Sequence, residues 1–441
     1  MIPGLQQLSI LPSLLWHPRA SRESVMGFQS RQLRRVIANA YDNVPYYRRL
    51  FDHAAVKPEQ IRTAADLVRI PITTRRDLQK QPLEDLLARG VDPKQLLIQP
   101  TSGSSGEPLL VRRMWWEQRI LGVLRLRGLA QCGARYNDRL AIILFHNKPA
   151  RRRSVLHRAL AAVQPIKVHE IHCLLEPEAI LAALEKIQPQ ILSGYASSLA
   201  LLAKVVSKSG HLPIHPRLII SGAEMLTPLA ERQISETFEA PVYDTYGSHE
   251  FGSIANPCKS SGGYHVFDDG LVVEVVQGGT PVAPGEHGSL VGTSLHAFAM
   301  PFIRYQLGDI VTRGPEGCEC GQPFSTLREI QGRIIDYFPL PGGRRLHPYE
   351  LLEVFRKDAY KWMYQYQLVQ ERRDRIVLRY VTRRQPSHDE ESQLRGRLSK
   401  LVGDDVDFTL LAVDHIESEK HGKFRMYKPF VDASMSQAST I

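Results

Sequence analysis

The sequence predicts an α/β fold with a large N-terminal domain, residues 1–335, and a small C-terminal α+β domain, residues 336–441. Single hydrophobic cores stop growing at roughly 250 to 300 residues, so a chain of 441 residues suits two domains. From residue 139 onward, short apolar runs alternate with helical patterns. A Pro/Gly-rich stretch then separates this region from a second β/α alternation. We therefore expect a mostly parallel sheet and a β-rich subdomain in the large domain.

Strands and helices take turns through the middle of the chain. Buried strands are expected at Leu140–Phe145, Ile191–Gly194, Leu218–Ser221 and Val242–Thr245. Helices open at Pro177 and Pro228, and another crosses Leu199 to Val206, because apolar residues recur there at helical spacing. This order implies a mostly parallel sheet with helices on its faces. From Leu271 the segments become β-rich between Gly/Pro turns, which favours a small barrel-like subdomain.

The C-terminal domain is predicted from its own compact pattern. Helices are expected at 349–355 and 390–402, and strands at 365–370, 376–381 and 408–413.

Composition bounds the classes of function. The formal net charge is +10, but the basic residues are dispersed and no aromatic stripe accompanies them, so we expect a solvated basic surface and no nucleic acid. No run of about 18 apolar residues exists, so no membrane span is expected. The first residues lack a basic segment and are broken by prolines, and five cysteines form no disulfide framework, so the prediction is a cytoplasmic protein. The oligomeric state stays open, a homodimer included.

The most informative segment is Thr101–Pro108, which reads TSGSSGEP. Small and hydroxyl residues let successive backbone N–H groups point into one concavity, which suits phosphate oxygens. The segment is not a Walker loop, because Gly106 is followed by Glu107 and Pro108 where Lys and Ser/Thr are required. A flexible linker is the alternative interpretation of the segment alone.

Further motifs follow this loop in a fixed order. They are YGSHE (Tyr246–Glu250), RYQLGD (Arg304–Asp309), GRIID (Gly332–Asp336) and GKFR (Gly422–Arg425). Together they resemble the ordered signature of the adenylate-forming superfamily, which includes acyl coenzyme A synthetases. VPYYRRLF (Val44–Phe51), IPITTRRDL (Ile70–Leu78) and SGAE (Ser221–Glu224) are similar to the phenylacetate coenzyme A ligase and CapK-like branch.

The resemblance implies an enzyme that uses ATP and Mg²⁺ to activate a small carboxylic acid as an acyl adenylate, and then forms a thioester with coenzyme A. Within enzymes, the alternative is a ligase or adenylyltransferase whose acceptor is a hydroxyl, an amine or a carrier-protein thiol. A rival of another class is a non-catalytic binding protein, or a nucleic-acid binder that uses the basic surface. The joint presence of Glu250, Asp309 and Lys423 favours the enzyme.

The same resemblance implies a role for each matching residue. Glu250 would hold Mg²⁺ against the phosphates, and Lys423 would stabilise charge at the α-phosphorus. Asp309 would accept hydrogen bonds from the ribose, and Asp336 would be the hinge of the small domain. The other nucleotide contacts would come from Thr101, Ser102, Gly103, Ser104, Ser105 and Gly106 at the phosphates, from Gly222, Ala223, Glu224, Asp244, Tyr246 and Gly247 at adenine, and from Arg333 at the ribose or phosphate.

Three cysteines and one histidine form a second candidate site. Cys258, His265, Cys318 and Cys320 are the ligand inventory of a closed structural zinc site. Similar cysteines occur in the resembling branch, whereas free buried cysteines are the alternative. Zinc here would tie the chain after Glu250 to the turn before Gly332, and would take no part in the chemistry.

Overall fold

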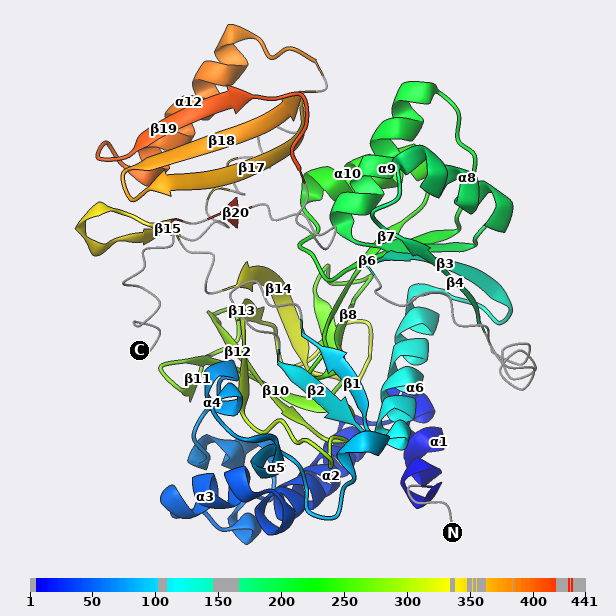
Figure 1. Cartoon of the computed structure of the whole chain (residues 1–441), viewed down its shortest axis with the longest axis vertical. Coiled ribbons are helices and arrows are strands. Elements are labelled where there is room, and N and C mark those ends of the chain that lie inside the picture. Colours follow the sequence, from blue (N-terminus) through cyan, green and yellow to red (C-terminus); the bar gives the residue numbers. More distant parts are fainter. Residues whose placement is uncertain are drawn as a thin grey trace. The chain divides into compact units, whose positions relative to one another are not determined.

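The computed structural model divides into two units (Figure 1). The first unit comprises Met1–Gly133 and Thr245–Gln331, and the second comprises Ala134–Asp244 and Gly332–Ile441. The structure describes residues 5–101, 109–145, 166–333, 338–346, 351, 354, 362–382, 384–417, 427, 428 and 430. The predicted domain boundary after residue 335 falls outside these ranges and stays a prediction.

Helices that the sequence analysis did not anticipate open the first unit. They are α1 (Leu11–Trp16), α2 (Arg22–Asn43), α3 (Pro45–His53), α4 (Arg75–Gln79), α5 (Leu83–Leu86) and α6 (Trp115–Cys132). Helix α2 begins where Ser21 caps it by accepting from the Ser24 amide over 3.2 Å. Pro45 starts α3, since proline fits the first helical position. Helix α6 ends at Gly133, whose φ of 108° is a left-handed conformation that glycine adopts readily.

The strands of the first unit form an open sheet. Its order is β11-β10-β12-β13-β14-β9-β8, with bounds β8 (Gly252–Pro257), β9 (Tyr264–Val266), β10 (Leu271–Gln277), β11 (Thr280–Pro281), β12 (His287–Ser294), β13 (Tyr305–Arg313) and β14 (Thr326–Arg333). Strands β10 and β12, and β12 and β13, pair antiparallel. The β-rich prediction is confirmed, but the barrel-like expectation is wrong, because the order of the described strands does not close on itself. A separate antiparallel ribbon, β1 (Leu97–Pro100) with β2 (Leu110–Arg113), flanks the hydroxyl-rich segment.

Two early motifs attach the N-terminal helices to the strand that carries Asp309. The Tyr47 hydroxyl donates to the Pro301 carbonyl and accepts from the Ile303 amide, each over 3.0 Å. The Thr73 amide donates to the Arg304 carbonyl over 2.9 Å. Tyr47 and Thr73 are fully buried, so these contacts are shielded from water. The start of β13 is therefore fixed by segments more than 200 residues earlier.

The second unit contains the predicted parallel sheet. Its strands β4 (Ile166–His172), β3 (Asp138–Leu144), β5 (Ile191–Gly194) and β6 (Leu218–Gly222) pair in parallel in that order. Helices α8 (Pro177–Ile187), α9 (Ala196–Ser209) and α10 (Pro228–Phe238) lie over this sheet (Figure 1). The predicted strands and helices are confirmed here. Strand β7 (Val242–Ser248) runs three residues past its predicted end, so Tyr246 and Gly247 lie in the strand rather than after it.

The C-terminal part of the second unit has its own sheet and core. Strands β19 (Asp407–Ala412), β18 (Arg375–Thr382), β17 (Met363–Arg372) and β20 (Tyr427–Lys428) form the sheet in that order. Helix α12 (His388–Val402) covers one of its faces (Figure 1) and buries Leu394, Leu398 and Val402. The α+β prediction is confirmed, whereas most of the expected helix at 349–355 lies outside the described residues. In the described part of the chain, every helix falls short of the length and apolarity needed to cross a bilayer.

Candidate active site

Thr101 and Leu109 close the base of the hydroxyl-rich loop. The Thr101 amide donates to the Leu109 carbonyl over 2.9 Å, and the Leu109 amide donates to Thr101 Oγ1 over 3.0 Å. Both residues are buried. The structure therefore brings the two ends of the loop together. Ser102, Gly103, Ser104, Ser105 and Gly106 lie outside the described residues, and their contacts to phosphate stay predictions.

Glu250 lies two residues beyond β7 and is 7% exposed. Its Oε1 accepts a hydrogen bond from the Tyr305 hydroxyl over 3.3 Å. Burial, and next the Glu250 charge, raise the pKa of Tyr305, so this hydroxyl stays a donor. Among the described residues, no Lys or Arg side chain forms an ion pair with Glu250. A buried carboxylate of this kind can accept a divalent cation, because Mg²⁺ prefers carboxylate and phosphate oxygens.

Arg75 belongs to this region although the sequence analysis gave it no role. Its Nη2 donates to Thr101 Oγ1 over 2.5 Å, and its positive charge lowers the pKa of Tyr305 against the larger effect of burial. Arg75 is the first residue of α4, where Thr74 and Asp77 form a capping box. That capping pattern inside IPITTRRDL was the available signal. It predicts a helix start, but not which loop the helix faces.

Asp309 and Tyr246, the residues predicted to contact ribose and adenine, are joined by a hydrogen bond. The Tyr246 hydroxyl donates to Asp309 Oδ2 over 2.5 Å. Asp309 is 9% exposed and follows Gly308, whose φ of 90° is left-handed. Gly247 must lack a side chain, because a Cβ there would lie 2.6 Å from the Gly252 carbonyl oxygen. The Asp309 carboxylate is thus oriented by the Tyr246 hydroxyl from β7, and its contact to ribose stays a prediction.

The second unit carries the SGAE turn at the end of β6. Glu224 Oε2 accepts from the Ser197 amide in the first turn of α9 over 2.9 Å, where the helix dipole favours a negative charge. Ala223 has φ of 64°, a left-handed conformation that costs energy in a residue other than glycine. The turn is therefore held in a specific shape by its own side chain. Gly222 is the last residue of β6, and Asp244 lies in β7, the next strand of the sheet.

Besides the five loop residues, three more predicted site residues have side chains that the structure does not describe. Asp336 and Lys423 lie outside the described residues. Arg333 is the last residue of β14, and the structure describes its backbone but not its side chain. Their roles stay predictions.

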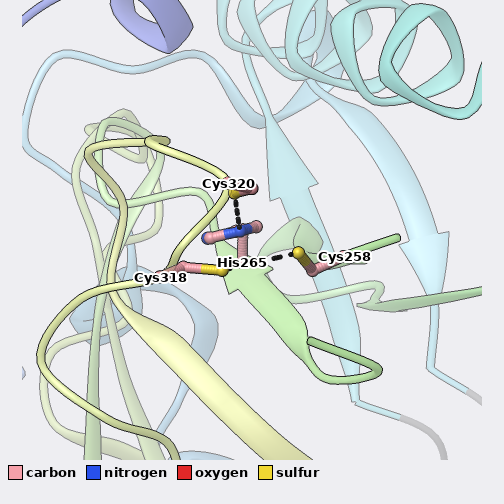
Figure 2. A group of neighbouring side chains, drawn as sticks. All are labelled: Cys258, His265, Cys318 and Cys320. Carbon is pink, nitrogen blue, oxygen red and sulfur yellow. Dashed lines mark hydrogen bonds between the residues drawn. The ribbon is translucent and has the colours of Figure 1, made fainter. Parts of the chain in front are cut away.

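The predicted zinc ligands come together in the first unit (Figure 2). One ligand atom from each of Cys258, His265, Cys318 and Cys320 lies within 4.8 Å of all the others. The Cys258 and Cys318 sulfurs are 3.6 Å apart, and His265 Nε2 is 3.1 Å from the Cys320 sulfur. Two sulfurs bound tetrahedrally at ~2.3 Å from one zinc ion would be ~3.8 Å apart. The donor set and its spacing therefore fit zinc.

The environment of these thiols differs from one to the next. Burial raises the pKa of Cys258, but hydrogen bonds from Ser261, Ser260 and Cys318 outweigh it and lower the pKa to about 6. Burial and then contacts with Cys318 and Cys258 raise the pKa of Cys320 to about 11. Cys258 thus loses its proton more readily than Cys320 does. A divalent cation would bind both sulfurs as thiolates and hold them deprotonated.

Comparisons with known proteins agree with this geometry. Residues 341–429 match the CapK C-terminal domain family. The phenylacetate-coenzyme A ligase of Thermus thermophilus is 29% identical over 333 residues, which cover 73% of each chain. The Escherichia coli enzyme of the same name is 26% identical and aligns over 89% of this chain and 92% of its own. Over most of its length the chain is therefore similar to curated phenylacetate-coenzyme A ligases.

The similarity falls in the phenylacetate-coenzyme A ligase-like and CapK-like branch that the sequence motifs resemble. A solved structure of 2-hydroxyisobutyryl-CoA ligase with a bound acyl adenylate has the same fold. Its TM-score is 0.75 at 19% identity, over 92% of this chain and 89% of that one. A benzoate CoA ligase from Burkholderia xenovorans has a TM-score of 0.52 at 16% identity, over 77% of this chain and 69% of that one. The predicted family and fold class are both confirmed.

Proposed function

We propose that this chain is an AMP-forming acid–thiol ligase that activates a small carboxylic acid with ATP and transfers the acyl group to coenzyme A. The observation that carries the proposal is the placement of Glu250. Its buried carboxylate is in the same unit as the closed base of the hydroxyl-rich loop. Arg75 contacts Thr101 at the loop base and also Tyr305, whose hydroxyl donates to Glu250. The aligned relatives, all named phenylacetate-coenzyme A ligase, support the thioester product.

In the first half-reaction a carboxylate oxygen of the substrate attacks the α-phosphorus of ATP. The bond to the bridging oxygen breaks, and pyrophosphate leaves with the electron pair. In the second, the coenzyme A sulfur attacks the acyl carbon, the bond to AMP breaks, and the thiol proton passes to solvent. Mg²⁺, held by Glu250, would neutralise the developing charge on the phosphates.

The other residues take the following roles in this proposal. Ser102 to Gly106 donate backbone and hydroxyl hydrogen bonds to the β and γ phosphates. Asp309, oriented by Tyr246, accepts from the ribose hydroxyls. Lys423 stabilises the α-phosphate during the first step and Asp336 is the hinge. The adenine-bordering set is Gly222, Ala223, Glu224, Asp244, Tyr246 and Gly247, and Arg333 reaches the ribose or phosphate.

A panel of carboxylic acids tests the proposal. Purified protein is incubated with ATP, Mg²⁺ and one acid, with phenylacetate, benzoate and 2-hydroxyisobutyrate as the first members, and AMP and pyrophosphate are measured with and without coenzyme A. We expect stoichiometric AMP, pyrophosphate and thioester when all reactants are present. Pyrophosphate release with no consumption of coenzyme A would point to a hydroxyl, amine or carrier-protein acceptor. Formation of ADP alone would refute the function.

A structural zinc ion is a second part of the proposal. It rests on the Cys258, His265, Cys318 and Cys320 cluster. Elemental analysis should find about one zinc per chain, and a Cys318→Ser, Cys320→Ser double variant should lose it and melt at lower temperature. Cys132→Ser is the matched control, because Cys132 is a core cysteine outside the cluster. Protein without zinc whose melting does not respond to a chelator would remove this part and leave the ligase proposal standing.

We also place the enzyme in the cytoplasm. None of the five cysteines forms a disulfide bond, as expected in a reducing compartment. Thiol labelling of the native protein in a cell extract tests this, because reduced cysteines would be modified and disulfide-bonded ones would not.

A further inference from the structure

Arg113 contacts both the loop base and the segment that carries Glu250. It is the last residue of β2, the strand that leaves the hydroxyl-rich loop, and it is 3% exposed. Its Nη1 donates to Gln99 Oε1 over 2.7 Å, on the strand that enters the loop. Its Nη2 donates to the Glu250 carbonyl over 2.9 Å and to the His249 carbonyl. One guanidinium thus joins three segments, two of which are 136 residues apart in sequence.

These contacts follow from the register of the β1–β2 ribbon. Gln99 pairs with Val111, and Leu97 pairs with Arg113, so Gln99 and Arg113 project from the same face. Arg112 projects from the opposite face with Ile98, which is 50% exposed. Because side chains alternate along the strand, Arg113 reaches the main chain of Glu250 and its neighbour Arg112 does not.

Arg113 binds the main chain of Glu250 and forms no ion pair with its carboxylate. The guanidinium contacts the main-chain carbonyl of Glu250, and among the described residues Arg113 has no ion pair within 4.0 Å. Burial lowers the pKa of Arg113, while the charges of Glu117 and Glu250 raise it. The positive charge thus lies near Glu250 without occupying its carboxylate oxygens.

We propose that Arg113 is a positioning residue that fixes the Mg²⁺-binding carboxylate of Glu250 relative to both ends of the phosphate loop. This deepens the proposed function and rests on it. Arginine suits the task because its planar fork offers five N–H donors in fixed directions, whereas lysine is a compact charge on a flexible stem. Both the loop and the carboxylate must meet the same triphosphate. A displacement of about 1 Å between them can cost on the order of 100-fold in rate.

The test compares Arg113→Lys, Gln99→Ala and the control Arg112→Lys. Each is assayed for acid-dependent pyrophosphate release over a range of Mg²⁺ concentrations, with melting temperature measured in parallel. We expect Arg113→Lys to raise the Mg²⁺ concentration for half-maximal rate about tenfold, on the scale of one lost hydrogen bond to a charged group, with the KM for the acid unchanged. Gln99→Ala should show a smaller shift in the same direction, and Arg112→Lys should behave as wild type.

The outcomes separate this inference from the proposed function. If wild-type protein forms AMP but Arg113→Lys keeps the wild-type Mg²⁺ dependence, the inference fails and the function stands. A loss of rate that follows only a loss of folded protein, with Mg²⁺ dependence unchanged, also refutes it. If wild-type protein forms no AMP with any acid, the proposed function fails and the role of Arg113 fails with it. Should Arg113→Lys not fold, the shift in Gln99→Ala decides.

Discussion

Two buried arginines of the first unit lie next to acidic residues, but one binds a side-chain carboxylate and the other binds a main-chain carbonyl. Arg127 binds the side chain of Asp269, with Nη1 to Oδ2 over 2.5 Å and Nη2 to Oδ1 over 2.8 Å. His17 contacts the same carboxylate over 2.7 Å. Arg113 instead binds the main-chain carbonyl of Glu250. Both oxygens of Asp269 are hydrogen-bonded to Arg127, whereas the Glu250 carboxylate is not bound by Arg113 and remains available to a ligand.

The comparison distinguishes residues that stabilise the fold, here called framework residues, from residues of the active site. Asp269 is fully buried; burial raises its pKa, but the hydrogen bonds from Arg127 and His17 outweigh this effect and hold the pKa below the ordinary value. Arg304, in the RYQLGD motif, is also a framework residue: it donates to both oxygens of Glu274, over 2.9 to 3.2 Å, and to three main-chain carbonyls. A charged residue inside a motif is therefore not by itself a site residue. What distinguishes Glu250 is that its charge is near cations without being bound by one.

Removing the framework carboxylate should have the largest effect. Asp269→Ala leaves the Arg127 guanidinium buried without its counter-charge, which we expect to lower the free energy of unfolding by about 3–5 kcal/mol. Urea unfolding followed by fluorescence measures it. Asp52→Asn is the control in the same unit, because Asp52 and Lys57 form an exposed pair that should matter little. Equal stability of Asp269→Ala and wild type would contradict the distinction.

Changing the site carboxylate should affect rate and not stability. Glu250→Gln keeps the size of the side chain and removes its charge, so we expect acid-dependent pyrophosphate release to fall by roughly 100-fold, the loss of one preorganised charge in a phosphoryl-transfer site. The melting temperature should stay near wild type. Glu250→Asp, which keeps the charge, should recover part of the rate at high Mg²⁺. Wild-type rate in Glu250→Gln would remove Glu250 from the site.

The cation at the loop base gives a smaller expected effect. Arg75→Met breaks the hydrogen bond to Thr101 Oγ1 and removes the charge near Tyr305, so we expect the KM for ATP to rise about tenfold, the scale of a hydrogen bond to a charged group. Arg76→Met is the control, since Arg76 is the exposed neighbour on the same helix. A rise in KM of equal size in both variants would show that general surface charge is responsible.

The sequence predicted those parts that depend on local pattern. The parallel strands of the second unit contain apolar runs such as Leu218–Ile220, and helices α8 and α10 open at prolines, so these elements could be located. Helix α2 was missed although Leu33, Val36, Ile37 and Ala40 recur at helical spacing, all fully buried. The candidate zinc ligands could be predicted because thiol and imidazole groups are metal ligands wherever they occur in the sequence.

Contacts that depend on long-range register could not be predicted. Arg113 and Arg112 are adjacent and chemically identical, and only the pairing of β1 with β2 decides which one faces Glu250. The link from Tyr47 to Pro301 and Ile303 spans more than 250 residues and needs the packed fold. A carboxylate that binds a backbone amide far along the chain, as Glu224 binds Ser197, leaves no trace in the spacing of residues. The sequence identified the type of site, and tertiary packing decided which charges serve it.

A buried histidine, His296, lies beside the Arg127–Asp269 pair and should make the stability of this region depend on pH. His296 contacts the Asp269 carbonyl over 2.7 Å, and burial lowers its pKa to about 4 against the raising effect of that carbonyl and of the Asp269 charge. Because the folded state disfavours the proton, this contribution to stability is complete above the unfolded pKa near 6.5 and is lost as pH falls through 4. Between pH 7.5 and pH 5.5 wild type should lose about 1 kcal/mol more than His296→Gln, which cannot titrate. Urea unfolding of both proteins at the two pH values measures the difference, and parallel losses would place the titration outside this network.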